Sequence, residues 1–119
     1  MWFLLGVLGA LAAGAVIVYV IRLTLQWLKD RLREKKIKDN AKKFLVITIN
    51  KLIRDSKNTV SLDDLEQLAQ LEREGKTHII AGVNGEDIVG DLDIIEADGQ
   101  DESIKHLIDR GDGRLVVEG

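Results

Sequence analysis

A run of positively charged side chains between Lys29 and Lys43 is the feature of this sequence with the clearest chemical meaning. Residues 22–57 hold twelve Lys and Arg against four Asp and Glu, a net charge of +8, whereas residues 58–119 hold five against sixteen, a net charge of −11. Clustered cations attract phosphates and other polyanions. The candidate polyanion-binding residues are Arg31, Arg33, Lys35, Lys36, Lys38, Lys42 and Lys43.

Two anionic partners suit this run. Lipid headgroups would contribute about 1 kcal/mol per Lys or Arg near an anionic leaflet. A nucleic-acid oligomer or nucleotide is the other possibility. Trp27 and Phe44 are the only aromatic residues interleaved with the basic ones, so base-specific recognition is not indicated.

Catalytic and metal-binding patterns are absent from the sequence. The chain has no Cys, two His (His78 and His106), and no GxGxxG, P-loop or HExxH pattern. Asp91 and Asp93, with Asp98 or Asp101, could surround a calcium ion, but their spacing is not that of an EF-hand loop. We therefore expect a protein that is not an enzyme, with no cofactor and no metal site.

The elements that would position the basic run begin with an uncharged stretch, residues 2–21. Twenty apolar residues in a helix measure about 30 Å, the thickness of a bilayer core, which predicts a transmembrane helix at residues 1–21. The positive charges all follow it, so the N-terminus is expected outside and the C-terminal part in the cytoplasm, in a single-pass inner-membrane protein. A cleaved signal peptide is the alternative, but no basic region precedes the stretch.

Small residues recur within this predicted span. Gly6, Ala10 and Gly14 are four residues apart, a spacing that lets membrane helices pack closely. They are the candidate helix-packing residues, and they predict a homo-oligomer.

Residues 22–57 are expected to form a basic juxtamembrane helical stalk, in part a coiled coil, because Leu25, Leu28 and Leu32 follow a three-four spacing. A strand at residues 44–49, which are rich in β-branched side chains, is the competing prediction.

Residues 58–119 are expected to form a small acidic cytoplasmic α+β domain of order α-β-β-α-β, with its helices on one face of the sheet. The first helix begins at Ser61 and stops at Gly75, strand 77–83 follows, and Asn84-Gly85 marks a hairpin. The return strand spans 88–95 and breaks at Asp98-Gly99. A helix at 101–110 and a strand at 115–117 complete the domain.

This layout of apolar span, basic stalk and compact head resembles the small membrane effectors of bacterial antiviral (anti-phage) defence, in particular the Hailong-type effectors. The resemblance implies an oligomeric ion channel kept closed by a DNA oligomer from a partner nucleotidyltransferase, with the seven candidate cations as its DNA contacts. The alternative function is a non-catalytic, membrane-anchored scaffold or adaptor whose acidic head binds a basic protein partner.

Overall fold

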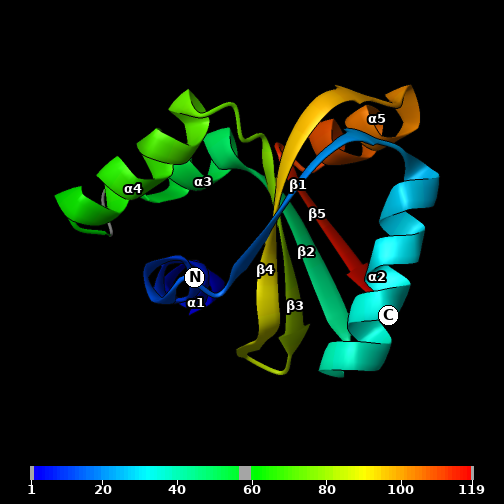
Figure 1. Cartoon of the computed structure of the whole chain (residues 1–119), viewed down its shortest axis with the longest axis horizontal. Coiled ribbons are helices and arrows are strands. Elements are labelled where there is room, and N and C mark those ends of the chain that lie inside the picture. The colour runs from blue at the N-terminus through cyan, green and yellow to red at the C-terminus, as the bar shows by residue number, and fades with distance from the viewer. Residues whose placement is uncertain (1, 57–59, 119) are drawn as a thin grey trace.

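The computed structural model describes the backbone of residues 2–56 and 60–118, and the side chains of residues 6–56 and 60–118. Within these ranges the chain forms five helices and five strands (Figure 1). In chain order they are α1 (Trp2–Ala13), β1 (Val16–Leu23), α2 (Leu25–Asp39), β2 (Lys43–Thr48), α3 (Ile49–Ser56), α4 (Leu62–Arg73), β3 (His78–Asn84), β4 (Asp87–Gln100), α5 (Glu102–Arg110) and β5 (Arg114–Glu118).

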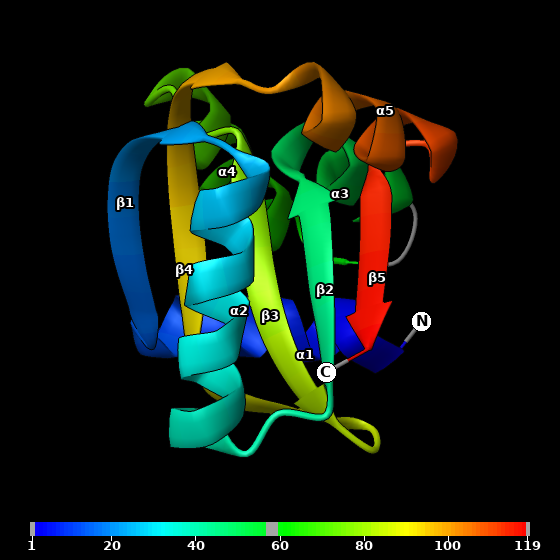
Figure 2. The same cartoon turned by 90° about the vertical axis from the view of Figure 1, so that its right-hand side faces the viewer.

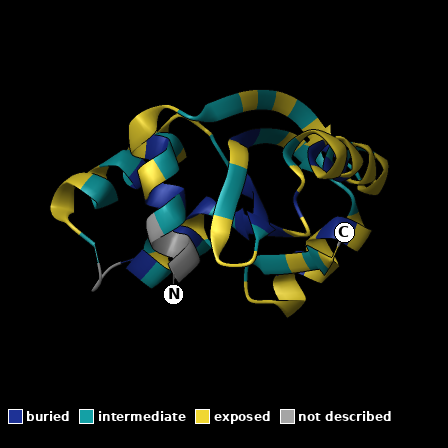
Figure 3. Cartoon of the chain, turned by 90° about the horizontal axis from the view of Figure 1, so that it is seen from below, coloured by how far each residue is buried: buried dark blue, intermediate teal, exposed yellow. Residues whose placement is uncertain are grey.

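The five strands form one mixed sheet of order β1-β4-β3-β2-β5, in which β1 runs parallel to β4 and the other neighbours are antiparallel. Helices α1, α3 and α4 cover one face, and α2 and α5 cover the other (Figures 1 and 2). Figure 3 shows the buried residues concentrated along the sheet and the exposed ones on the outer helix surfaces. Burial of apolar surface on both faces is therefore what holds the layers together.

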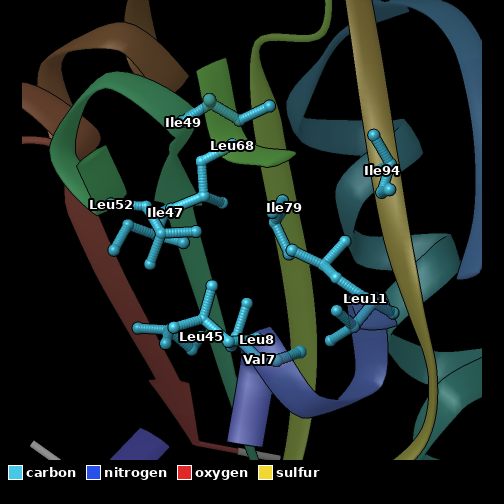
Figure 4. Close-up of a cluster of buried hydrophobic side chains, with 12 residues drawn as sticks. Val7, Leu8, Leu11, Leu45, Ile47, Ile49, Leu52, Leu68, Ile79 and Ile94 are labelled. Carbon is cyan, nitrogen blue, oxygen red and sulfur yellow. The ribbon is translucent and has the colours of Figure 1, made fainter. Parts of the chain in front are cut away.

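The first face carries side chains from widely separated parts of the chain. Val7 and Leu11 of α1 meet Ile47 of β2, Ile79 of β3 and Ile94 of β4 in one buried cluster (Figure 4). The N-terminal helix is thus part of the protein core, because Val7, Leu8 and Leu11 are buried in this cluster.

The predicted transmembrane helix is wrong. Residues 2–21 form α1, which has 12 residues, and most of β1. Gly14 turns the chain with a φ of +74°, and the following residues 16–21 are mostly Val and Ile, which favour a strand. No helix in the described part of the chain is long and apolar enough to cross a membrane. The single-pass fold, the inner-membrane location with its N-out orientation, and the ion channel are contradicted with it.

The small residues of the predicted span have places within one chain. A Cβ atom on Gly6 would lie 2.7 Å from Cγ1 of Ile88, so glycine lets α1 approach the β3–β4 hairpin. Ala10 packs against the first core cluster, and Gly14 makes the turn into β1. Their spacing therefore has an intramolecular explanation.

The predicted long stalk helix and coiled coil are also wrong, because residues 22–56 form the end of β1, α2, β2 and α3. Asn40, with a φ of +57°, ends α2 in the left-handed conformation. The competing strand forms as β2, between β3 and β5, and buries Phe44 to Ile47 on both faces of the sheet. A strand that is buried on both faces does not alternate apolar and polar residues. Its apolar residues could therefore be fitted to the spacing of a helix as well.

The elements expected over residues 61–118 form in the expected order, but not as a separate head. Ser61 caps α4 by accepting a hydrogen bond from the Asp64 N–H at 3.2 Å, and Asn84-Gly85 joins β3 to β4. Strand β4 continues through Asp98-Gly99 to Gln100, and helices lie on both faces. Strands β3 and β4 share their sheet with β1 and β2, and the predicted boundary at residues 57 and 58 lies outside the described residues.

Candidate anion-binding site

Helix α2 carries most of the candidate basic residues. It begins at Thr24, whose hydroxyl accepts a hydrogen bond from the Trp27 N–H at 3.0 Å. Lys36 and Lys38 lie in its last turn, where positive charge interacts favourably with the helix dipole. Leu28 and Leu32 are buried against the sheet, so the residues around them divide between an inner and an outer surface.

Arg31 and Lys35 are directed toward the sheet, where both meet Asp93 of β4. Arg31 donates from Nε and Nη2 to the two carboxylate oxygens at 2.6 and 3.0 Å. Lys35 donates to the Asp91 carbonyl oxygen at 2.7 Å and lies 3.7 Å from Asp93. The hydrogen bond to Asp93 raises the pKa of Arg31 above its ordinary value. Asp93 and Lys35 are almost fully buried, so these charges stabilise one another and are not available to a ligand.

A second set of cations forms the wall of a groove on the outer surface of α2. Lys29, Arg33 and Lys36 fall on one stripe of the helix, at a spacing of four and three residues. The groove has a volume of about 390 Å³ and lies between α2 and the last strand, β5. The apolar part of its lining is Leu32, Phe44 and Val117, and Glu118 of β5 completes it. Figure 2 shows this part of the sheet, over β2 and β5, beside α2 and below α5. The cationic wall therefore stands next to an apolar lining.

In the described part of the chain, the cations of this wall form no ion pair, and the one carboxylate that lines the groove, Glu118, lies 3.6 Å from Lys43. Among the described residues, no acidic group lies within ion-pair distance of Lys29, Arg33 or Lys36, nor of Lys38 or Lys42. Most other basic residues of the chain are paired with Asp or Glu. An uncompensated cluster in a protein of net charge −3 is a local positive field that an anionic ligand could neutralise.

The structure thus divides the seven predicted residues. Arg31 and Lys35 are bound to Asp93, and Arg33 and Lys36 line the groove. Lys38 lies on the other flank of α2, at a small hollow of about 90 Å³ that also contacts Asp39 and Asp91. Lys42 is exposed before β2, and Lys43 lies 3.6 Å from Glu118. Lys29 was not among the residues predicted from the sequence. Its spacing of four residues from Arg33 and seven from Lys36 places all three on one side of a helix, and this pattern could have identified it.

The acidic residues do not assemble into a cation site. Asp93, one of the carboxylates considered above as a possible calcium ligand, receives two hydrogen bonds from Arg31. In the described part of the chain, no group of three or more His, Asp or Glu side chains is arranged to hold a metal ion.

Comparison of the chain with protein-family models, curated proteins and solved structures finds no match.

Proposed function

We propose that this protein is a non-catalytic binding protein for linear polyanions, with a nucleic-acid oligomer as the expected ligand, held along the groove between α2 and β5. The observation that supports the proposal is the stripe of three uncompensated cations, Lys29, Arg33 and Lys36, along one wall of that groove.

The form of the groove favours an extended ligand over a small anion. Successive cations of the stripe are about 6 and 4.5 Å apart along the helix axis, given a rise of about 1.5 Å per residue. They present their charges in a row and do not converge on one point. A chain of phosphates can contact all three at once, and each contact releases a counterion.

The apolar lining of the groove predicts binding without base specificity. Phe44 is only 2% exposed, so its ring is covered by neighbouring side chains and offers no face on which a base could stack. Contacts would therefore be made to the backbone of the polyanion, and binding should depend strongly on salt.

The charge distribution over the two faces of the sheet also supports binding of the polyanion on the α2 side. Helix α2 contains six basic and three acidic residues, whereas α4, on the opposite face of the sheet, contains four acidic residues and one basic residue. The resulting field attracts a polyanion to the α2 side and repels it from the α4 side.

Fluorescence anisotropy with a labelled single-stranded DNA of about 20 nucleotides tests the proposal, measured over a range of salt concentrations. Replacing two groove cations, in Arg33→Gln plus Lys36→Gln, should weaken binding about tenfold or more at low salt. Losing two phosphate contacts should also reduce the slope of log K against log salt by about 1.4, since each contributes about 0.7 for a single strand.

The matched control is Lys105→Gln plus Arg110→Gln, which removes the same charge from α5, outside the groove. We expect this variant to lose much less affinity. Equal losses in the two variants would mean that binding follows net charge alone, which contradicts the groove. Failure of the unmodified protein to bind DNA at low salt would refute the proposal, as would be expected if the protein were instead an adaptor for a basic partner.

A further inference from the structure

A second hollow, of about 430 Å³, lies at the end of the sheet where β2 ends and β3 begins. It is lined by the final residues of β4, including Ala97 and Gln100, by the end of α4 and by the start of α3. Its volume is in the range typical of small-molecule sites, about 300–1,000 Å³. We call it the β-end pocket.

His78, one of the residues that line the β-end pocket, contacts the neighbouring Thr77 through its imidazole ring. Its Nδ1 lies 2.7 Å from the hydroxyl oxygen of Thr77. That hydroxyl lies 3.1 Å from the Ile95 carbonyl oxygen, to which it donates its single hydrogen, and it accepts from the Ala97 N–H at 3.1 Å. If it donated to His78 instead, two oxygen lone pairs would face each other at 3.1 Å. This pattern favours the tautomer that carries the proton on Nδ1, which leaves Nε2 as an acceptor.

The second ring nitrogen of His78, Nε2, has no hydrogen-bond partner among the described residues. The described part of the chain contains no fully buried side-chain nitrogen or oxygen without a partner. Nε2 is therefore not fully enclosed, and we assign its open side to the β-end pocket because His78 lines that pocket. Burial also lowers the pKa of His78 to about 4, so the ring is uncharged at neutral pH.

The other polar groups of the β-end pocket indicate the charge of its ligand. Lys76 is paired with Glu96 at 3.0 Å, and Glu72 has no basic partner among the described residues. With His78 uncharged, the pocket has no excess positive charge to offer a phosphate or carboxylate. The side-chain amides of Asn50 and Gln100 also line the pocket, and neither has a hydrogen-bond partner in the described part of the chain.

We propose that the β-end pocket binds a small uncharged molecule with a cyclic amide edge, the N–H beside C=O arrangement found in nucleobases. The N–H of the ligand donates to Nε2 of His78. The side-chain amide of Asn50 or Gln100 offers an N–H donor and a C=O acceptor. These groups complement the carbonyl and the other polar atoms of the ligand.

Calorimetric titration of the full chain with uracil, and in parallel with 1,3-dimethyluracil, tests the proposal. Uracil should bind with a Kd on the order of 1 mM or tighter, as expected for a ligand of this size. The dimethylated ring keeps the shape and the carbonyl groups but has no N–H, so it should bind about tenfold more weakly. No measurable binding of uracil, or equal binding of the two rings, would overturn the proposal.

The site is located with His78→Phe, which keeps a ring but removes the acceptor, and with His106→Phe as the matched control on the exposed surface of α5. We expect the first to lose uracil binding about tenfold or more and the second to leave it unchanged. If His78→Phe does not fold, the 15N resonance of His78 Nε2 in the unmodified protein decides. The resonance should have the chemical shift of an unprotonated nitrogen in the free protein, and it should move when uracil is added. A resonance that does not move would refute the proposed contact between uracil and Nε2.

Discussion

His78 should make the stability of this protein sensitive to mild acid. In the folded state burial keeps its ring uncharged down to a pH of about 4, whereas in the unfolded chain it becomes protonated below its ordinary pKa of 6.5. The unfolded state therefore binds more protons between these values, and the free energy of unfolding falls as pH decreases from 6.5 to 4. The full effect is about 3 kcal/mol.

Urea unfolding at several pH values between 7 and 4 measures this dependence. In His78→Gln the stability should fall much less over the same window, because the carboxamide does not titrate. The exposed His106 is the matched control, and His106→Gln should keep the pH dependence of the unmodified protein. Identical pH profiles for all three proteins would show that His78 is not held in its neutral form by the fold.

Asp93 shows why the anion-binding residues could be predicted only in part from the sequence. The basic run is visible in the sequence, and so is its excess of positive charge. The withdrawal of Arg31 and Lys35 from the surface depends on the Asp93 carboxylate on β4, 62 residues from Arg31 along the chain. Charge reversal at Lys35 would place a second carboxylate beside buried Asp93, so a loss of binding there would report unfolding. Reversal at exposed Lys36 has no such effect.

At the scale of elements, the features that are encoded locally could be predicted. A capping serine at Ser61, a hairpin at Asn84-Gly85 and a stop near Gly75 each depend on neighbouring residues, and the structure places an element boundary at each of them. The first 21 residues could not be predicted from hydropathy alone, because a lipid bilayer and a protein core both accept uncharged residues. Their composition does hold a signal, since Leu and Ala dominate before Gly14, and Val and Ile dominate after it.

Two glycines distinguish the observed turn from one continuous helix. Gly9 lies inside α1 with no atom near its potential Cβ, so Gly9→Ala should raise stability by about 0.5–1 kcal/mol through helix propensity. Gly14 has a φ of +74°, which an L-residue adopts with strain, so Gly14→Ala should lower stability by about 1 kcal/mol. Urea denaturation of the two variants measures the contrast. If Gly14→Ala were also stabilising, residues 2–21 would form one uninterrupted helix after all.

At the scale of the whole molecule, the long-range pairing of β1 with β4 joins the N-terminal residues to the rest of the protein. Strand β1 pairs with β4 from Val16 opposite Leu92 to Ile21 opposite Ala97, a register that no local pattern specifies. Segments expected to form a span, a stalk and a head all contribute strands to one sheet, and they share its core clusters. The first residues are therefore part of the shared sheet and core, and removing them should disturb that core.

A truncated chain that begins at Arg22 puts this integration to the test. It lacks Val7, Leu8 and Leu11, which are nearly fully buried, and most of the strand that covers the edge of β4. Each lost side chain removes about 1.5–3 kcal/mol of burial, which together rivals the entire stability of a small protein, about 5–15 kcal/mol. We expect the truncated chain to show no cooperative thermal transition and poorly dispersed amide resonances. A membrane-anchored stalk and head would behave in the opposite way, because losing the anchor would leave the remaining fold with its transition unchanged.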